Sequence, residues 1–138
     1  MCNEYYTVSK PSESLYIVKK SKFISNVVPV NGAKEAEDHL EKFRKKYWDA
    51  THNVYAYSIG LKGELQRFSD DGEPSGTAGK PVLEVIKSTD VKNVLIVVTR
   101  YFGGIHLGAS GLIRAYSESA SRGLKNSKIV KKIKCDVF

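Results

Sequence analysis

An apolar run at residues 93–102, NVLIVVTRYF, limits the folds open to this chain more than any other segment. An unbroken run of this kind is typical of a central strand that other elements cover. The segment that follows at residues 110–124, SGLIRAYSESASRGL, has a helical repeat. The residues that share one helical face are Leu112, Ala115, Tyr116, Ser119, Ala120 and Gly123. Because most of them are small, we predict a helix that packs closely on the sheet containing the strand.

Shorter patterns add further elements. Residues 14–30 are rich in β-branched and aromatic residues and break near Lys20, which predicts a hairpin or a bent strand. Residues 33–48 have the apolar spacing of an amphipathic helix, and residues 52–60 and 64–69 have the pattern of a second hairpin. A short helix is predicted to begin at Pro81. Together these elements predict an α+β fold, a two-layer sandwich of a mixed sheet with helices packed chiefly on one face.

With 138 residues, the chain has the size of a single domain. Its 41% hydrophobic and 27% charged residues are ordinary for a soluble globular protein. The apolar runs are far shorter than the roughly 20 residues of a membrane helix, and no signal peptide is evident, so we predict a cytoplasmic location without membrane contact. Cys2 and Cys135 are expected to be free thiols, and the scattered His39, His52 and His106 do not predict a metal centre.

Two glycine triplets share the spacing GxxxGxxG, and each lies between a predicted strand and a predicted helix. They are Gly72, Gly76 and Gly79, and Gly104, Gly108 and Gly111. Glycine permits positive φ and close ligand approach, while the first N–H groups of a helix attract anions. The pattern predicts either one cleft where two helix starts meet an anion or two tight turns without a ligand. Neither triplet is a dinucleotide or ATP fingerprint.

The first triplet belongs to RFSDDGEPSGTAGKP at residues 67–81, which also holds Asp70, Asp71 and Glu73. These carboxylates suit Mg²⁺ that keeps several waters for a phosphate substrate. Asp-Asp-Gly is equally ordinary turn chemistry without a metal. No motif places a base beside a serine of this region, so a nucleophilic triad is not predicted.

The charge of the chain, +7, is concentrated in its last third. Residues 91–138 hold nine Lys/Arg against two Asp/Glu, an excess of seven. The candidate nucleic-acid contacts are Lys125, Lys128, Lys131, Lys132 and Lys134. Such a run is either a footprint for phosphate backbones or a solvated edge strand protected by lysines.

Long motifs of this sequence resemble those of the IMPACT/YigZ family. They are HNVYAYSIG at residues 52–60, RFSDDGEPSGTAGKP at 67–81 and VVTRYFGGIHLGASGLIRAYSESA at 97–120. The resemblance implies a fold similar to the second domain of ribosomal protein S-five. Bacterial relatives usually carry a ferredoxin-like domain after this one, and we expect residues 1–138 to be a single IMPACT N-terminal-like domain without it. Phe68 and Ser110 depart from the family pattern.

The family resemblance and the residues leave two functional hypotheses. The first is a non-enzymatic regulatory or binding protein, linked to translation, that binds RNA, the ribosome or a protein partner without a cofactor. The second is a metal-dependent phosphate-handling enzyme that uses Asp70, Asp71 and Glu73. The predicted ligand-binding cleft comprises His52, Asp70, Asp71, Gly72, Glu73, Ser75, Gly76, Thr77, Gly79, Lys80, Arg100, Tyr101, Gly103, Gly104, Gly108 and Arg114.

Overall fold

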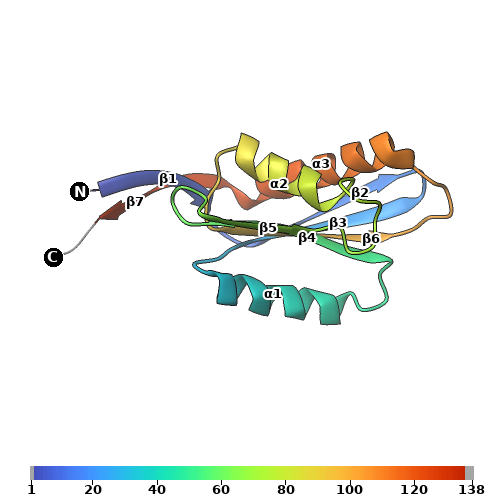
Figure 1. The fold of residues 1–138 in the computed structure, drawn as a ribbon, viewed down its shortest axis with the longest axis horizontal. Coiled ribbons are helices and arrows are strands. Elements are labelled where there is room, and N and C mark those ends of the chain that lie inside the picture. Colours follow the sequence, from blue (N-terminus) through green and yellow to red (C-terminus); the bar gives the residue numbers. More distant parts are fainter. Residues whose placement is uncertain (1, 136–138) are drawn as a thin grey trace.

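The computed structural model describes residues 2–135. A five-stranded sheet forms its middle layer (Figure 1). In spatial order its strands are β2 (Ser12–Val18), β3 (Ser21–Pro29), β6 (Val94–Tyr101), β4 (His52–Ile59) and β5 (Leu65–Ser69). The helices are α1 (Ala33–Lys46), α2 (Gly79–Ser88) and α3 (Gly108–Ser127). A separate two-stranded ribbon pairs β1 (Cys2–Val8) with β7 (Ile129–Cys135).

Strand β6 lies at the centre of the sheet, between β3 and β4, as its apolar sequence predicts. Its residues are buried on both faces, because their side chains alternate between two cores. Ile96 and Val98 pack with α2 and α3, whereas Leu95 and Val97 pack with α1. The helix predicted after Ser110 is α3, and Tyr116 and Ala120 of its buried face contact the first core.

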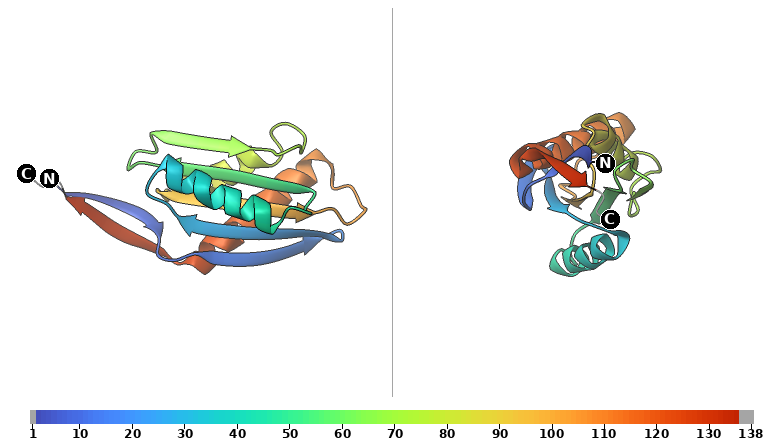
Figure 2. Two further views of the ribbon diagram at one scale, coloured as in Figure 1. Left: turned by 90° about the horizontal axis from the view of Figure 1, so that it is seen from below. Right: turned by 90° about the vertical axis from the view of Figure 1, so that its left-hand side faces the viewer.

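The α+β sandwich is confirmed, and two of its details differ from the prediction. All four pairings in the five-stranded sheet are antiparallel, so this sheet is not mixed. Helix α1 covers the face opposite to α2 and α3, which adds a third layer (Figures 1 and 2). Apolar spacing identifies the buried side of a helix but not the face of the sheet that it covers, so α1 could not be placed from its own pattern.

The terminal ribbon was predicted only in part. An edge strand was one of two interpretations of the lysine-rich segment, and β7 is that strand, whereas β1 was missed. Cys135 lies opposite Cys2 in the strand register and is disulfide-bonded, so the expectation of a free thiol there is wrong. Residues far apart in sequence become neighbours when strands pair, and cysteine spacing alone does not show this.

Four connections gather at one end of the sheet, which is the right-hand end in Figure 1 and in the left view of Figure 2. They are residues 19–20, 47–51, 70–78 and 102–107, and we call this region the loop end. Antiparallel pairing brings the start of β3 and of β4 to the finish of β6, with Ser21 two residues from the Phe23–Arg100 pair and His52 opposite Arg100. Within residues 2–135, no helix is long and apolar enough to cross a membrane.

Candidate functional site

The first glycine loop is organised by the carboxylate of Asp70. This carboxylate accepts hydrogen bonds from the backbone N–H groups of Gly76 at 3.0 Å, Ala78 at 3.2 Å and Gly79 at 2.8 Å. It therefore occupies the positive end of the α2 dipole, the position that one of the two interpretations of the glycine triplets gave to an external anion. Helix α2 begins at Gly79 rather than at Pro81, because Asp70 supplies the N–H acceptor that starts it two residues earlier.

Glu73 leaves the same loop and enters the protein interior. Its carboxylate is buried, and both of its oxygens accept hydrogen bonds from Nη1 of Arg100, at 2.8 and 3.1 Å. The hydroxyl of Tyr116 in α3 donates a third hydrogen bond to it at 2.5 Å. Arg100 also donates to the hydroxyl of Ser21 at 3.2 Å. This buried cluster joins the first loop to β6, α3 and the start of β3.

Burial dominates the ionisation of Tyr116. Removal from water, followed by the hydrogen bond to Glu73 and the negative charge of that carboxylate, raises the pKa of the Tyr116 phenol far above its ordinary value. The phenol therefore stays protonated and keeps donating to Glu73 throughout the neutral range.

His52 and Asp71 fasten the outer side of the loop to β4. Nδ1 of His52 lies 2.7 Å from the carbonyl oxygen of Asp71, and Nε2 lies 3.2 Å from the Glu73 carboxylate. The Asp71 carboxylate accepts the backbone N–H of Asn53 at 2.7 Å. Asp71 has a φ of 43°, so its backbone is in the left-handed region that an Asp-Gly turn tolerates.

The remaining residues of the first loop fall into two groups. Thr77 and Gly79 are buried; the Thr77 hydroxyl donates to the carbonyl of Pro74, and a Cβ at Gly79 would lie 2.7 Å from the backbone of Ser69. Gly72 and Gly76 have positive φ. Ser75 and Lys80 are exposed. The loop is thus packed around its own carboxylates.

The second glycine loop follows β6. The N–H of Gly103 donates to the Ser21 hydroxyl at 3.2 Å, and a Cβ there would lie 2.0 Å from the Lys20 carbonyl oxygen. Gly104 and Gly108 have positive φ and are exposed. The side chain of Tyr101 lies on the face of the sheet opposite to that of Arg100. There its hydroxyl donates to the Asp49 carboxylate at 2.8 Å. Both glycine loops lie at the loop end and are joined by buried hydrogen bonds, since Arg100 donates to Glu73 of the first loop and both Arg100 and Gly103 donate to Ser21.

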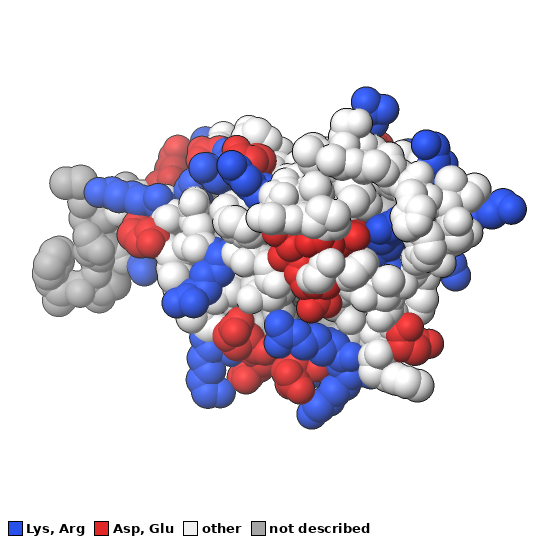
Figure 3. All heavy atoms as spheres, turned by 45° about the vertical axis from the view of Figure 1, so that its right-hand side comes forward, with Lys and Arg blue, Asp and Glu red and all other residues white. Residues whose placement is uncertain are grey.

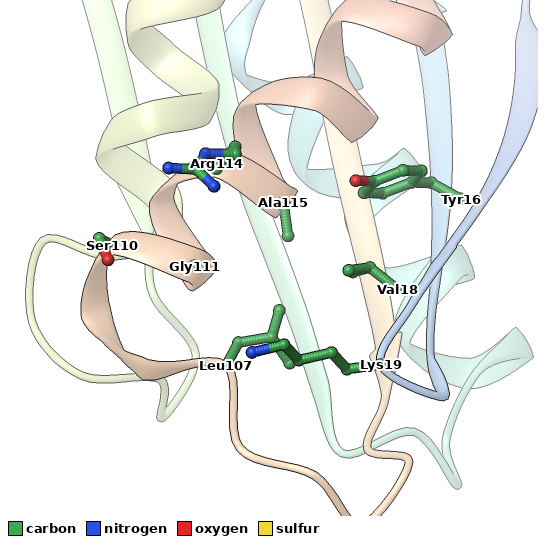
Figure 4. A pocket seen from close by; sticks show the side chains of 8 residues that line it. All are labelled: Tyr16, Val18, Lys19, Leu107, Ser110, Gly111, Arg114 and Ala115. Atoms are coloured by element: carbon green, nitrogen blue, oxygen red, sulfur yellow. The ribbon is translucent and has the colours of Figure 1, made fainter.

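A pocket of about 240 Å³ lies beside the second loop (Figure 4). Its lining residues are Tyr16, Val18, Lys19, Leu107, Ser110, Gly111, Arg114 and Ala115. In Figure 4, Lys19 runs alongside Leu107, whereas Arg114 points away from it on the other side of Gly111. The two cations therefore do not converge on one anion.

The candidate nucleic-acid contacts do not form one surface. Lys125 belongs to α3, and Lys128 follows it with a φ of 59°. Strand alternation places Lys132 and Lys134 on one face of β7 and Lys131 on the other, where Lys131 pairs with Glu4 at 3.4 Å. Elsewhere on the molecule, charges of both signs alternate over α1 at the bottom of Figure 3.

Sequence reasoning missed two members of the buried cluster, Tyr116 and Ser21. The sequence placed Tyr116 on the buried face of the helix. Its role in the cluster was indicated only by its hydroxyl group, which it carries on a large side chain among mostly small residues. Ser21 carried no signal, because it lies 79 positions from its partner Arg100 and only strand pairing joins them. Among residues 2–135, no three side chains of His, Cys, Asp and Glu are grouped as metal ligands. Asp70, Asp71 and Glu73 each have their own protein partners instead.

Comparison with known proteins gives consistent relationships. The Impact N-terminal domain matches residues 19–124. The IMPACT family member YvyE of Bacillus subtilis (strain 168) is 48% identical over 132 residues, which cover 96% of this chain and 61% of that protein. This chain thus spans about three fifths of that relative.

Two solved structures are similar in fold. A crystal structure of a hypothetical protein has a TM-score of 0.88 and 34% identity, covering 94% of this chain and 64% of that one. The two-domain translational regulator Yih1 has a TM-score of 0.51 and 29% identity, covering 86% and 46%. Sequence and fold agree over most of the chain, and the protein therefore belongs to the IMPACT family.

Proposed function

We propose that this protein is a non-enzymatic regulatory or binding module linked to translation, which acts by binding RNA, the ribosome or a protein partner. The observation that carries the proposal is the internal use of the motif carboxylates. Asp70 holds three backbone N–H groups, and Glu73 is bound by Arg100 and Tyr116. A carboxylate engaged in this way is not free to position a metal or to accept a substrate proton.

The relatives support the link with translation. Yih1 is described as a translational regulator, and this chain shares its fold over 86% of its own length. We also propose that residues 1–138 act as one domain, because the ribbon is tied to the sheet region by the hydrogen bond from the N–H of Lys92 to the carbonyl of Tyr6 and by Val8, which is fully buried in the core that α2 and α3 cover.

Ribosome co-sedimentation tests the proposal. The protein, centrifuged with purified ribosomes, should enter the pellet in a saturable and salt-sensitive manner, and a lysate pull-down should retain specific partners. Failure of both measurements would contradict a binding role.

A magnesium titration tests the competing enzyme hypothesis. In isothermal titration calorimetry, Mg²⁺ should show no saturable binding to Asp70, Asp71 and Glu73, because each of these carboxylates already has protein partners. The variants Asp70→Asn and Asp71→Asn serve as comparisons. A Mg²⁺ site that both variants abolish would favour the phosphate-handling enzyme instead.

A further inference from the structure

Strand β2 forms one edge of the five-stranded sheet, and within residues 2–135 no strand pairs with its outer side. Its connection to β3 is a two-residue turn in which Lys19 and Lys20 both have positive φ. The residues that flank such a turn exchange hydrogen bonds with each other. Because bonded and non-bonded pairs alternate along an antiparallel ladder, the N–H and C=O groups of Leu15 and Ile17 point away from β3. The outer side of β2 is therefore a template for another strand.

A contact from α3 agrees with this orientation of the β2 backbone. Nδ2 of Asn126, near the end of α3, donates to the Glu13 carbonyl at 3.2 Å. Glu13 precedes Leu15 by two residues, so its carbonyl points to the same outer side. Among residues 2–135, the outward groups of Leu15 and Ile17 have no such partner. The open part of the edge therefore begins after Glu13.

The side chains of Leu15 and Ile17 form an apolar patch beside this open edge. They are 53% and 59% exposed, and strand alternation places both on the face opposite to Tyr16 and Val18, which pack against the core beneath α2 and α3. The half-buried Ile24 lies opposite Leu15 in the strand register and extends the patch. In the left view of Figure 2, β2 runs along the lower edge of the sheet, and α1 lies in front of strands farther from that edge. A strand added to β2 would bury this patch.

The other face of β2 borders a groove along α3. Tyr16 extends from β2 toward α3 (Figure 4), and the Arg122 guanidinium lies over its ring, 4.5 Å from the centroid. A hollow of about 400 Å³ at this place is lined by Glu13, Ser14, Leu15, Arg122, Lys125 and Asn126. The pocket beside the second loop continues this side of β2 toward the turn, where Lys19 runs alongside Leu107 (Figure 4). We call these two hollows together the β2–α3 groove.

The unpaired charge of the β2–α3 groove is positive. Lys19, Arg122 and Lys125 are exposed there. Glu118 pairs with Arg122 at 2.8 Å, and strand alternation turns the Glu13 side chain to the face of the apolar patch. Within residues 2–135, neither Lys19 nor Lys125 has a carboxylate within 4.0 Å. The groove is therefore complementary to acidic side chains.

We infer that the β2 edge binds an extended segment of a protein partner as an additional strand. Its apolar side chains cover Leu15 and Ile17, and its acidic side chains face Arg122, Lys125 and Lys19 across the groove. Because successive side chains of a strand point to opposite faces, this segment alternates apolar and acidic residues. Main-chain hydrogen bonds to the edge give affinity, and the two faces give specificity. The inference rests on the proposed function and specifies the class of partner.

Two other occupants fit these features less well. RNA lacks both the amide groups that would pair with the strand edge and the aliphatic side chains that would cover the patch. A second copy of the chain, paired through β2, would place the α3 cations of both copies on the same side of the joined sheet. Like charges set side by side in this way oppose association.

Fluorescence anisotropy with a labelled peptide in which glutamate and valine alternate tests this site. The peptide should bind saturably, and added salt should weaken the binding. Leu15→Asp combined with Ile17→Asp should weaken binding at least about tenfold, because the patch becomes charged like the peptide. Lys125→Glu should weaken it by about threefold to tenfold. In amide hydrogen exchange, the N–H groups of Leu15 and Ile17 should become protected when the peptide is added.

Matched controls accompany these measurements. Phe68→Asp adds a charge at a residue that is 45% exposed on β5, the other edge strand, and Lys34→Glu reverses an exposed charge on α1. Both variants should bind the peptide like the unmodified protein, and urea melts of all variants establish that they are folded. A peptide of the same composition with its valines grouped together, and one with lysine in place of glutamate, should bind weakly.

The outcomes separate this inference from the proposed function. Absence of peptide binding at low salt would overturn the inference, as would binding that Leu15→Asp with Ile17→Asp leaves unchanged. Dimerisation in sedimentation equilibrium that this double variant abolishes would assign the edge to a second copy and refute the peptide site. Ribosome co-sedimentation and the lysate pull-down judge the proposed function independently, so a binding role confirmed there would survive the loss of this site.

Discussion

Glu73 is the residue on which the geometry of the loop end depends. It is one of the few buried charged side chains, and its partners come from β4, β6 and α3. A buried guanidinium that loses its carboxylate keeps its full desolvation cost. The Glu73–Arg100 pair is therefore the buried part of the link between the loop and the sheet, beside the outer contacts of His52 and Asp71.

We predict that Glu73→Gln lowers the free energy of unfolding by about 3 to 5 kcal/mol, because it leaves the Arg100 charge uncompensated. Urea denaturation measures this change. Glu84→Gln is the control, since Glu84 forms an exposed pair with Lys87 at 3.7 Å and its loss should cost less than about 0.5 kcal/mol. Equal effects of the two substitutions would contradict a buried charge pair.

Tyr116 makes stability sensitive to alkaline pH. Its pKa is raised in the folded protein, so its contribution is fully present below the unfolded value of about 10 and is lost as pH rises above that value. Tyr116→Phe should be less stable by about 1 to 3 kcal/mol at neutral pH, because Glu73 loses a hydrogen bond. In urea melts, this difference should narrow above about pH 10. A difference that stays constant through this range would refute the assignment.

At the scale of elements, β6 forms the boundary between the two cores. We predict that Ile96→Ala destabilises the protein by about 2 to 5 kcal/mol, because Ile96 is fully buried beneath α2 and α3. Ile113→Ala on the exposed side of α3 is the comparison and should change stability little. A loss below about 1 kcal/mol for Ile96→Ala in denaturant melts would show that the site relaxes around the cavity.

Close packing of α3 on β3 depends on Gly123. A Cβ at this position would lie 2.5 Å from Oγ of Ser25 and 2.8 Å from Cγ2 of Val27. Gly123→Ala should therefore destabilise the protein by about 1 to 3 kcal/mol in thermal or urea melts, although alanine favours the helix itself. Gly32→Ala, where a Cβ meets nothing within 4 Å, should be nearly neutral. A stabilised Gly123→Ala variant would show that helix propensity outweighs the contact.

At the scale of the whole molecule, the ribbon and the loop end lie at opposite ends of the structure (Figure 1). If the ribbon contributes to RNA binding, Lys132 and Lys134 act together from one face of β7, while Lys131 faces away. Changing Lys131, Lys132 and Lys134 to Ser should then reduce the salt slope by about 1.4 rather than about 2. Anisotropy with several RNA sequences should show equal losses, because phosphate contacts do not read bases. An unchanged slope would remove the ribbon from RNA binding.

The elements of the sheet and the three helices could be predicted from local pattern, because apolar periodicity records which side of each segment is buried. The apolar run at residues 93–102 predicted β6, and the small-residue face predicted α3 and its closeness to the sheet. The motif loops also led to the prediction that Asp70, Glu73 and Arg100 lie in one cleft. These features depend on neighbours in sequence or on spacing within one element.

Tertiary structure alone decided what those polar residues do. The sequence shows three carboxylates beside glycines, a pattern compatible with a metal, an anion site or a turn. Folding turns Asp70 onto the start of α2 and buries Glu73 against Arg100 and Tyr116, because strand pairing brings β4 and β6 together and α3 packs over them. Contacts between residues 27 and 43 positions apart arise from this packing, so local pattern could not reveal which of the three roles each carboxylate has.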